Sequence, residues 1–264
     1  MTFKNKVIWI TGASSGIGEA LAYALAKQGA VLILSSRKTA VLKQVQQTCQ
    51  KTCQEVYVQT LDLEQHDKIP SIVQKVIQER GPIDILINNG GISQRSLAQD
   101  TIFEVDKRLM DINYLGTIAL TKALLPHFLK RQKGHFVTVT SLTGVFGTPY
   151  RSAYAATKHA LHGFFDSLRA ELVNNSIDVT LISPGFIKTN VSINAFVGDG
   201  QAQGSMDNRQ SNGMQVDVFA QKMLQAIVKK KKKVYIGKKE VIMVYIKRFI
   251  PWLYYKMIAR VAVR

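Results

Sequence analysis

Tyr154 and Lys158 are the residues whose types and spacing most directly suggest chemistry. They lie four positions apart in residues 153–171, whose Ala, Leu and Phe content favours a helix, so both side chains leave the same face. A nearby ammonium lowers the pKa of a tyrosine from about 10, which would make Tyr154 an acid or base nearer neutral pH. Ser141 follows an apolar run, residues 135–140, and is placed to hydrogen-bond a substrate carbonyl. The alternative is a surface helix with an unrelated tyrosine and lysine, because this spacing is common by chance.

A glycine-rich turn near the start of the chain predicts a phosphate site. The sequence TGASSGIG follows the apolar run of residues 7–10 and leads into a helical pattern over residues 19–28. Glycines allow close backbone approach, and the exposed amides of a helix N-terminus attract an anion. Because the turn lies between a strand and a helix, we favour nucleotide binding over a purely structural turn. The residues predicted to contact the nucleotide here are Gly12, Ser14, Ser15, Gly16, Ile17 and Gly18.

Arg37 bears on which dinucleotide binds. It follows the second apolar run, residues 30–35, where an acidic residue would accept hydrogen bonds from the adenosine ribose. That acid is missing and an arginine suits a 2′-phosphate, so we predict NADP(H) rather than NAD; the alternative is a solvent-facing arginine. After the third run, residues 56–60, Asp62 is placed to meet the adenine edge, and Leu63 is predicted to contact the cofactor beside it.

Further candidates follow the later apolar runs. Residues 83–87 lead into NNGG, whose small residues let the backbone pass close to a cofactor, and residues 177–182 lead into SPG. The cofactor contacts predicted from these two segments are Asn89, Gly90, Pro184, Gly185, Ile187 and Thr189. Asn113 lies in a helical stretch, residues 101–131, where asparagine is unfavourable. The residues alone leave open whether it only bends the helix or has a function.

The alternation of apolar runs and helical patterns predicts the fold class. Six runs alternate with helices, and VYIG at residues 234–237 is a seventh candidate strand. Such alternation gives right-handed crossovers and a parallel sheet covered on both faces. We therefore predict an α/β protein with a single Rossmann domain, residues 1–237, on a doubly wound parallel sheet of about seven strands. Its ligands would bind at the carboxyl ends of the strands, with residues 186–215 as a mobile cover over the substrate.

The net charge of +17 comes mainly from the C-terminal part of the 264-residue chain. From residue 229 onward, twelve Lys or Arg and one acid give +11, which leaves +6 for residues 1–228. The charge is therefore a feature of the tail rather than of the fold. Because no nucleic-acid-binding motif accompanies it, we predict no nucleic-acid binding.

Residues 238–264 are predicted to form a basic and aromatic helical extension. A basic stripe repeats every four positions after Pro251 and comprises Lys256, Arg260 and Arg264. A second face is apolar and comprises Tyr254, Met257, Ile258 and Val261. This pattern is typical of a helix that lies on an anionic lipid surface. A helix packed on its own subunit or on a partner would show it too, so both interpretations stay open.

Other features exclude several classes of protein. Cys49 and Cys53 have no further candidate ligand near them in sequence, so we expect reduced thiols and no metal site. The first residues carry too short an apolar run for a signal peptide, and no apolar stretch reaches the roughly eighteen residues of a spanning helix. We expect a cytoplasmic protein, peripheral at a membrane surface if the lipid interpretation of the tail holds.

In their order along the chain, these motifs resemble the short-chain dehydrogenase/reductase family over residues 7–189 and, more loosely, as far as residue 237. The resemblance rests on TGASSGIG, NNGG, Asn113, Ser141, Tyr154, Lys158 and SPG. It implies an NADP(H)-dependent oxidoreductase that interconverts a carbonyl and a secondary alcohol by hydride transfer, without a metal. Gly90 departs from the family, which usually has alanine there, and this small change should leave cofactor binding intact.

The resemblance also implies a role for each catalytic position. Tyr154 would pass a proton to or from the substrate oxygen while Ser141 holds that oxygen. Lys158 would bind the nicotinamide ribose and lower the tyrosine pKa, and Asn113 would hold a water that relays protons to Lys158. Members of the family often form homodimers or homotetramers through the helices that hold Asn113 and Tyr154. The small residues at positions 152–156 fit such an interface, although they would also suit packing within the subunit.

The loop VSINAFVGDG, followed by Met206, Asp207 and the lysine run, is similar to one branch of the family, the 7B-type reductases. These are associated with reduction of acyl- and alkyl-dihydroxyacetone phosphate, which implies a lipid-like ketone as substrate; a small soluble carbonyl compound is the other class considered. The competing function is a non-catalytic NADP-binding sensor or interaction protein on the same fold. Such proteins commonly lose the tyrosine or the lysine, whereas all four catalytic positions are filled here.

Overall fold

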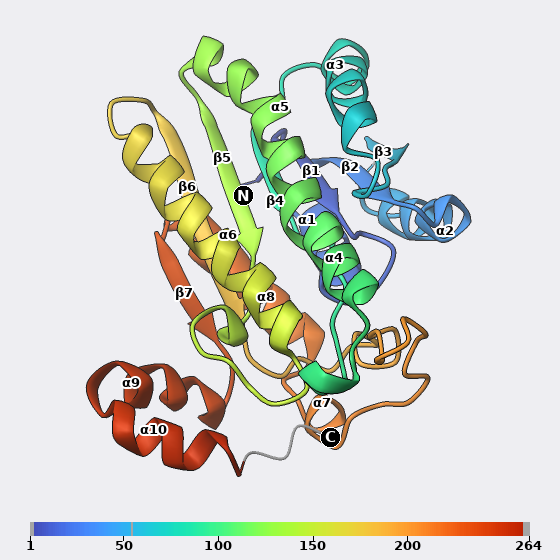
Figure 1. Ribbon diagram of the computed structural model, residues 1–264. Coiled ribbons are helices and arrows are strands. Elements are labelled where there is room, and N and C mark those ends of the chain that lie inside the picture. The colour runs from blue at the N-terminus through green and yellow to red at the C-terminus, as the bar shows by residue number, and fades with distance from the viewer. Residues whose placement is uncertain (1–2, 54, 261–264) are drawn as a thin grey trace.

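A computed structural model describes residues 3–53 and 55–260 of the chain. In this part of the chain seven parallel strands form one sheet in the order β3-β2-β1-β4-β5-β6-β7 (Figure 1). The strands are β1 (Val7–Thr11), β2 (Val31–Ser36), β3 (Val56–Thr60), β4 (Ile85–Asn88), β5 (Gly134–Val139), β6 (Ile177–Pro184) and β7 (Lys233–Ile236). The order reverses direction between β1 and β4. This confirms the predicted doubly wound sheet.

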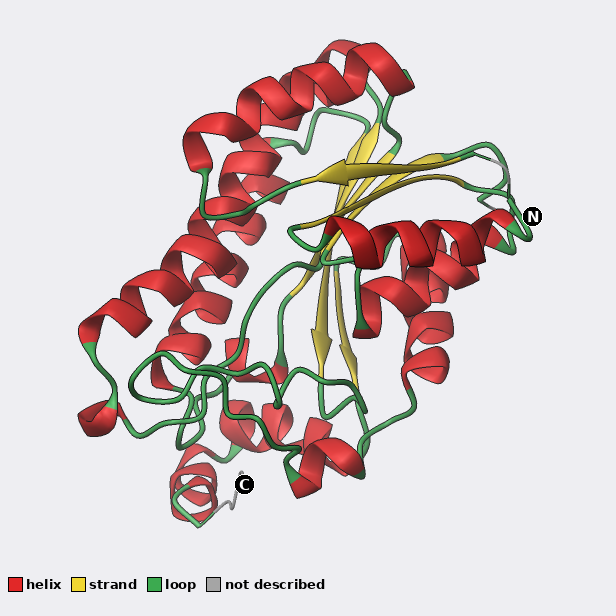
Figure 2. Cartoon of the chain, turned by 90° about the vertical axis from the view of Figure 1, so that its right-hand side faces the viewer, coloured by secondary structure: helices red, strands yellow, loops and turns green. Residues whose placement is uncertain are grey.

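Helices cover both faces of the sheet (Figure 2). One face carries α1 (Gly16–Ala26), α2 (Thr39–Gln50) and α8 (Val216–Val228). The other carries α3 (Ile69–Arg80), α4 (Phe103–Met110), α5 (Gly116–Arg131) and α6 (Ser152–Glu171). The remaining helices are α7 (Asn208–Ser211), α9 (Ile242–Phe249) and α10 (Pro251–Ile258). Single turns are η1 (His66–Lys68), η2 (Ala98–Asp100), η3 (Asp111–Leu115), η4 (Leu142–Gly144) and η5 (Lys239–Val241).

The core lies in two layers, one on each side of the sheet. In β1, Ile8 and Ile10 belong to one cluster, whereas Trp9 belongs to the other, as the two-residue period of a strand requires. Ile8 is paired with Leu32 in β2, and Trp9 with Ile33, so neighbouring strands send matching apolar side chains to each face. This two-sided burial explains why the strands read as continuous apolar runs.

The stretch predicted as one long helix over residues 101–131 is divided in the structure. It comprises α4, the single π-helical turn η3 and α5. Asn113 lies in η3, so the unfavourable asparagine coincides with an interruption of α-helical geometry. Such π turns occur frequently at functional sites.

The C-terminal extension contains two helices where the sequence indicated one. Figure 1 shows α9 and α10 beside each other beyond the carboxyl end of the sheet. Of the predicted apolar face, Tyr254 is buried and packs with Phe146 and Val244, whereas Met257 is exposed, so only part of this face packs on its own subunit. Lys256 and Arg260 of the basic stripe are exposed, while Val261 and Arg264 lie outside the described residues. Within residues 3–53 and 55–260, none of the helices combines the length and apolar character that crossing a bilayer requires.

Candidate active site

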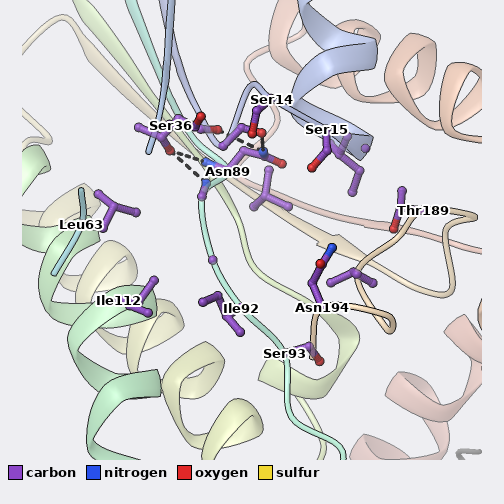
Figure 3. A pocket seen from close by; sticks show the side chains of 18 of the residues that line it. Ser14, Ser15, Ser36, Leu63, Asn89, Ile92, Ser93, Ile112, Thr189 and Asn194 are labelled. Atoms are coloured by element: carbon purple, nitrogen blue, oxygen red, sulfur yellow. Dashed lines mark hydrogen bonds between the residues drawn. The ribbon is translucent and has the colours of Figure 1, made fainter. Parts of the chain in front are cut away.

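A cavity of about 420 Å³ lies at the carboxyl ends of β1, β4 and β5, beside the point where the strand order reverses. Figure 3 shows side chains from the glycine turn, the end of β2, the segment after β4 and the loop after β6 converging on it. The predicted site residues that line it are Gly12, Ser14, Ser15, Gly16, Ile17, Arg37, Asp62, Leu63, Asn89, Gly90, Ser141, Tyr154, Lys158, Pro184, Ile187 and Thr189. Gly18, Asn113 and Gly185 lie outside its lining.

The glycine turn has the shape that close approach of a phosphate requires. Gly12 and Gly16 have φ angles of +64° and +58°, which residues with a Cβ rarely adopt. Gly18 lies directly against the Gly12 carbonyl, so its role is packing of α1 on the turn rather than ligand contact. Ser15, the N-cap of α1, makes no side-chain capping hydrogen bond, which leaves the first amides of the helix available to an anion.

The segment after β4 is fixed to the glycine turn by a hydroxyl and an amide. Thr11 Oγ1 accepts hydrogen bonds from the backbone N–H groups of Asn89 and Gly90 at 3.0 and 2.9 Å. Asn89 Nδ2 donates to the carbonyls of Thr11 and Gly12 at 3.0 and 3.2 Å. A Cβ at Gly90 would lie 2.9 Å from the end of the Leu63 side chain, so glycine here leaves slightly more space than alanine. Thr11 was not predicted, because a threonine at a strand end has no distinctive sequence signal.

Arg37 lines the cavity at the end of β2, but its charge is shared. Its Nη1 lies 3.3 Å from Glu64 Oε2, and Arg108 Nε lies 2.8 Å from Glu64 Oε1. The backbone N–H of Glu64 in turn donates to Asp62 Oδ1 at 3.1 Å. Glu64 was not predicted as a site residue. It forms an ion pair with Arg37, the residue that the sequence analysis assigns to a 2′-phosphate.

Ser141, Tyr154 and Lys158 come together where the cavity meets the end of β5. Ser141 Oγ accepts hydrogen bonds from Thr143 N and Thr143 Oγ1 at 3.1 and 2.9 Å, and it also hydrogen-bonds the Tyr154 side chain. Lys158 Nζ lies 5.7 Å from the centre of the Tyr154 ring and donates to the Val139 carbonyl at 3.1 Å. The predicted serine, tyrosine and lysine therefore form one cluster at the cavity wall.

The ionisation of this cluster differs from the sequence-based expectation. Burial raises the pKa of Tyr154, and this outweighs the lowering effects of Arg151, the Ser141 hydrogen bond and Arg95. Lys158 is not among the groups that lower it, because its Nζ lies toward Val139 and burial lowers its own pKa to about 8. The expectation that Lys158 lowers the tyrosine pKa is thus wrong for the protein without cofactor.

Asn113 lies behind the cavity wall and is fully buried. Its Oδ1 accepts from Ile92 N and its Nδ2 donates to Ile92 O, both at 2.8 Å, while Nδ2 also donates to Thr157 Oγ1 at 3.2 Å. A Cβ built on Gly91 would lie 2.8 Å from Asn113 Oδ1 and 3.7 Å from Lys158 Nζ, so these groups are neighbours. The side chain therefore ties η3 to the segment after β4 and to α6; its predicted role in a water relay stays a prediction.

Gln94 positions the tyrosine and was not found from the sequence. Its Oε1 accepts hydrogen bonds from the backbone N–H groups of Ala153 and Tyr154 at 3.0 and 3.2 Å, at the start of α6. Gln94 is fully buried. A glutamine that caps a helix 59 positions along the chain has no local sequence signature.

A second cavity, of about 910 Å³, opens on the other side of Ser141. It lies between the loop that follows β6 and the helices α9 and α10, and it shares Ser141 and Pro184 with the first cavity. Gly185, predicted to contact the cofactor, lines this second cavity instead, with Glu240 packed against it.

Comparison with known proteins fits this geometry. A profile described as short chain dehydrogenase matches residues 6–198. The chain belongs to the short-chain dehydrogenase/reductase family, and it is an oxidoreductase by that membership. It is 40% identical over 261 residues to dehydrogenase/reductase SDR family member 7B of Mus musculus, covering 97% of this chain and 81% of the mouse protein.

Two solved structures share the fold. A short-chain dehydrogenase/reductase from Burkholderia phymatum, in complex with NAD, superposes with a TM-score of 0.85 at 20% identity, covering 96% of each chain. An alcohol dehydrogenase from Thermococcus sibiricus, complexed with 5-hydroxy-NADP, superposes with a TM-score of 0.74 at 23% identity, covering 89% of this chain and 97% of that one.

Proposed function

We propose that this short-chain dehydrogenase/reductase uses NADP(H) to interconvert a lipid-like ketone and its secondary alcohol, with Tyr154 as the acid/base. The observation that carries the proposal is the convergence of Ser141, Tyr154 and Lys158 at the wall of a cavity built on a glycine cradle. Serine and tyrosine hydroxyls can hold and protonate a carbonyl oxygen, and a buried lysine adds positive charge beside them.

The first cavity fits a dinucleotide. The uncapped N-terminus of α1 and the positive φ angles of Gly12 and Gly16 suit a pyrophosphate, and the presence of Arg37 in the cavity lining supports contact with a 2′-phosphate. The similar structures carry NAD in one case and an NADP derivative in the other, so the preference for NADP(H) rests on Arg37 and on the missing acid. When bound, the nicotinamide cofactor supplies or accepts the hydride.

The protein's own residues handle the proton. Ser141 Oγ accepts both hydrogen bonds from Thr143, so its own hydroxyl proton is free to be donated to Tyr154 or to a substrate oxygen. The raised pKa of Tyr154 keeps the phenol protonated, which suits donation to a carbonyl oxygen in the reductive direction. Lys158 would then return a proton to the phenol, and the water predicted at Asn113 would supply that proton to Lys158.

Replacing Tyr154 by Phe tests the proposal. We expect turnover of any ketone substrate to fall by at least a thousandfold, because the proton donor is lost, while the Kd for NADPH changes by less than about threefold. Turnover is followed by NADPH absorbance and binding by nucleotide fluorescence. Retained turnover would remove Tyr154 from the chemistry. NADPH binding without turnover of any carbonyl by the unmutated protein would favour the non-catalytic sensor.

The lipid-like substrate class is supported by the second cavity. It is wide, its walls include Leu142, Phe146 and Ile242, and it opens directly beside Ser141. A panel of carbonyl compounds should contain an acyl-dihydroxyacetone phosphate in vesicles and several small ketones in solution. Turnover of the lipid ketone alone would support the proposal, whereas turnover of only the small ketones would keep the enzyme class and discard the lipid substrate.

We also propose a homodimer or homotetramer in the cytoplasm, peripheral at a membrane surface. Phe103 at the start of α4 is 75% exposed and Ala156 on α6 is exposed, in keeping with a partner subunit on these helices. Several large apolar side chains of α9 and α10 are exposed as well, which favours membrane contact through this part of the extension. Light scattering at micromolar concentration tests the assembly, and a strict monomer would exclude it.

A further inference from the structure

The second cavity combines apolar walls with buried polar groups that lack partners. Ser141 forms part of the wall that adjoins the first cavity, and Met243, Met257 and Ile258 contribute apolar side chains from the C-terminal helices. Arg151 and Thr148 also line it. Among the described residues, the Oγ1 of Thr148 and the Nε and Nη2 of Arg151 are buried without a hydrogen-bond partner. Buried donors of this kind normally have an acceptor, so a ligand is the natural candidate.

Arg151 is a guanidinium held inside the protein, with a residue exposure of 6%. Its nearest carboxylate is Asp207, whose Oδ2 lies 3.7 Å from Arg151 Nη2, beyond hydrogen-bonding distance. Burial, together with the neighbouring Arg95, lowers the pKa of Arg151 to about 9, so it still carries its charge at neutral pH. A buried charge with imperfect compensation is unfavourable unless a ligand completes it.

Asp207 compensates Arg151 only in part, because both of its oxygens accept hydrogen bonds from other groups. Its Oδ2 accepts a hydrogen bond of 2.6 Å from Arg95 Nε, and its Oδ1 accepts one of 2.8 Å from Gln203 Nε2. Arg151 therefore meets this carboxylate only as an ion pair at 3.7 Å, and its Nη2 donates no hydrogen bond to it. Arg95 points to Asp207 and Ser93, so Arg151 is the arginine placed at the lining.

The mouth of the cavity adds further positive charge. Arg209 is exposed, and its guanidinium lies 5.8 Å from the Phe186 ring, against which Arg151 packs at 5.5 Å. Lys238 and Lys239 also line the cavity. Glu240 is the one acid among the described residues of the lining, and its Oε1 accepts hydrogen bonds from the backbone N–H groups of Phe186 and Lys238 at 3.0 and 3.1 Å. Among these described residues, cations outnumber anions.

We propose that the second cavity binds an amphiphilic ketone with an anionic group close to its carbonyl, and that Arg151 and Thr148 bind this anion while the apolar walls hold the chain. Arg151 lines the same cavity as Ser141 and acts electrostatically on Tyr154, so an anion bound to Arg151 would lie on the same side of the substrate as the reacting carbonyl. Arg209 attracts the anion at the entrance. This deepens the proposed function by naming the feature of the substrate that the enzyme recognises.

Binding of unreactive amphiphiles tests the anion site independently of turnover. The probes are decyl phosphate, decanoate and decanol, titrated by calorimetry into the full chain at concentrations below micelle formation. We expect the preferred anion to bind at least tenfold more tightly than decanol. The affinity ratio of decyl phosphate to decanoate distinguishes a phosphate from a carboxylate substrate.

Variants then assign the site to Arg151. We expect Arg151→Gln to weaken binding of the preferred anion at least tenfold and to leave decanol binding within twofold. Arg151→Lys should retain most of the anion preference, and Arg209→Gln, which changes an exposed residue, should weaken anion binding about threefold. Arg80→Gln, at a half-buried arginine of α3 that does not line the second cavity, is the matched control and should change neither.

The proposal is overturned if decanol binds as tightly as both anions, or if Arg151→Gln weakens decanol binding as much as anion binding, since Arg151 would then only support the fold. Should Arg151→Gln not fold, unchanged anion binding in both Arg151→Lys and Arg209→Gln would overturn it as well. Tyr154→Phe should bind all three probes normally. Anion binding by a protein that turns over no ketone would preserve this site and reject the proposed function.

Discussion

Lys158 is a buried ammonium whose environment opposes its charge. Its residue exposure is 5%, it donates to the Val139 carbonyl, and burial lowers its pKa from 10.5 to about 8. The unfolded chain therefore holds a proton on Lys158 between pH 8 and 10.5 that the folded protein has released. The contribution of Lys158 to the free energy of unfolding accordingly rises with pH across that window. Below pH 8 the buried lysine is charged, and its full unfavourable contribution lowers the stability of the fold. Such a lysine is retained for activity rather than for stability.

Replacing Lys158 by Met should therefore stabilise the protein without cofactor at pH 7 while removing turnover. The shift of the lysine pKa corresponds to about 3 kcal/mol, from which the lost hydrogen bond to Val139 subtracts about 1 kcal/mol. Urea unfolding at pH 7 and pH 9.5 measures both effects. Lys130→Met, on the exposed side of α5, is the control. Equal stability gains of Lys158→Met at the two pH values would contradict the argument, because the gain should shrink as the native lysine loses its proton.

Arg37 and Glu64 form a second residue-scale pair with a measurable consequence. Charge-assisted hydrogen bonds contribute about 1.5 to 3 kcal/mol, so Arg37→Ala should weaken NADPH binding roughly tenfold to a hundredfold while NADH binding changes less than threefold. Glu64→Gln should strengthen NADPH binding, since it releases Arg37 from an ion pair. Fluorescence titration of both nucleotides measures these changes. Equal losses for NADPH and NADH in Arg37→Ala would remove Arg37 from 2′-phosphate recognition.

At the scale of elements, the strands and the glycine turn were predictable because their signals are local. The apolar run of residues 56–60 is β3, and the turn between β1 and α1 has the expected positive φ angles. The π turn at Asn113 was not predictable, since the sequence indicates only that α-helix is unfavourable there. Gln94 and Arg151 were missed because their roles arise from burial against segments distant in sequence.

The C-terminal helices are held by contacts to the segment that follows Ser141. Tyr254 OH donates to the Gly147 carbonyl and Lys247 Nζ to the Val145 carbonyl, both at 2.7 Å, and Tyr254 packs on Phe146. Because α10 lines the second cavity but not the first, its attachment should affect the substrate and not the cofactor.

Tyr254→Ala should therefore loosen α9 and α10 without unfolding the sheet. We expect faster amide hydrogen exchange in residues 242–258, a rise of at least fivefold in KM for a lipid ketone, and an unchanged Kd for NADPH. Tyr254→Phe removes only the hydroxyl and should lose about 1 kcal/mol of local stability. Tyr255→Ala, at a neighbouring residue that is 66% exposed, is the matched control. If Tyr255→Ala had the same effect as Tyr254→Ala, then packing of Tyr254 would not determine the shape of the second cavity.

At the scale of the whole molecule, part of the positive charge lies on the C-terminal helices together with exposed apolar side chains. Residues 229–264 carry +11 of the net +17, of which the lysine run 229–233 leads into β7 at the amino end of the sheet. Lys247, Arg248 and Lys256 belong to α9 and α10, which also carry exposed apolar side chains. Of these, Phe249 is 71% exposed and Trp252 is 69% exposed. Tyr254 and Ile258 instead face inward toward Phe146, so the outward apolar surface of Phe249 and Trp252 differs from the apolar face that the sequence predicted. The outward one is not needed for packing within the subunit.

This outward surface should bind anionic membranes. We expect the protein to sediment with vesicles that contain phosphatidylserine, to bind pure phosphatidylcholine at least tenfold more weakly, and to be released by about 0.5 M salt, because basic residues supply much of the attraction. Phe249→Ser combined with Trp252→Ser should abolish sedimentation and leave turnover of a soluble ketone unchanged. Phe103→Ser, at an equally exposed residue on α4, should still sediment. The contrary outcome is that the double variant still sediments with vesicles but changes the molar mass measured by light scattering without lipid. This surface would then join copies of the chain, and the membrane interpretation would fail.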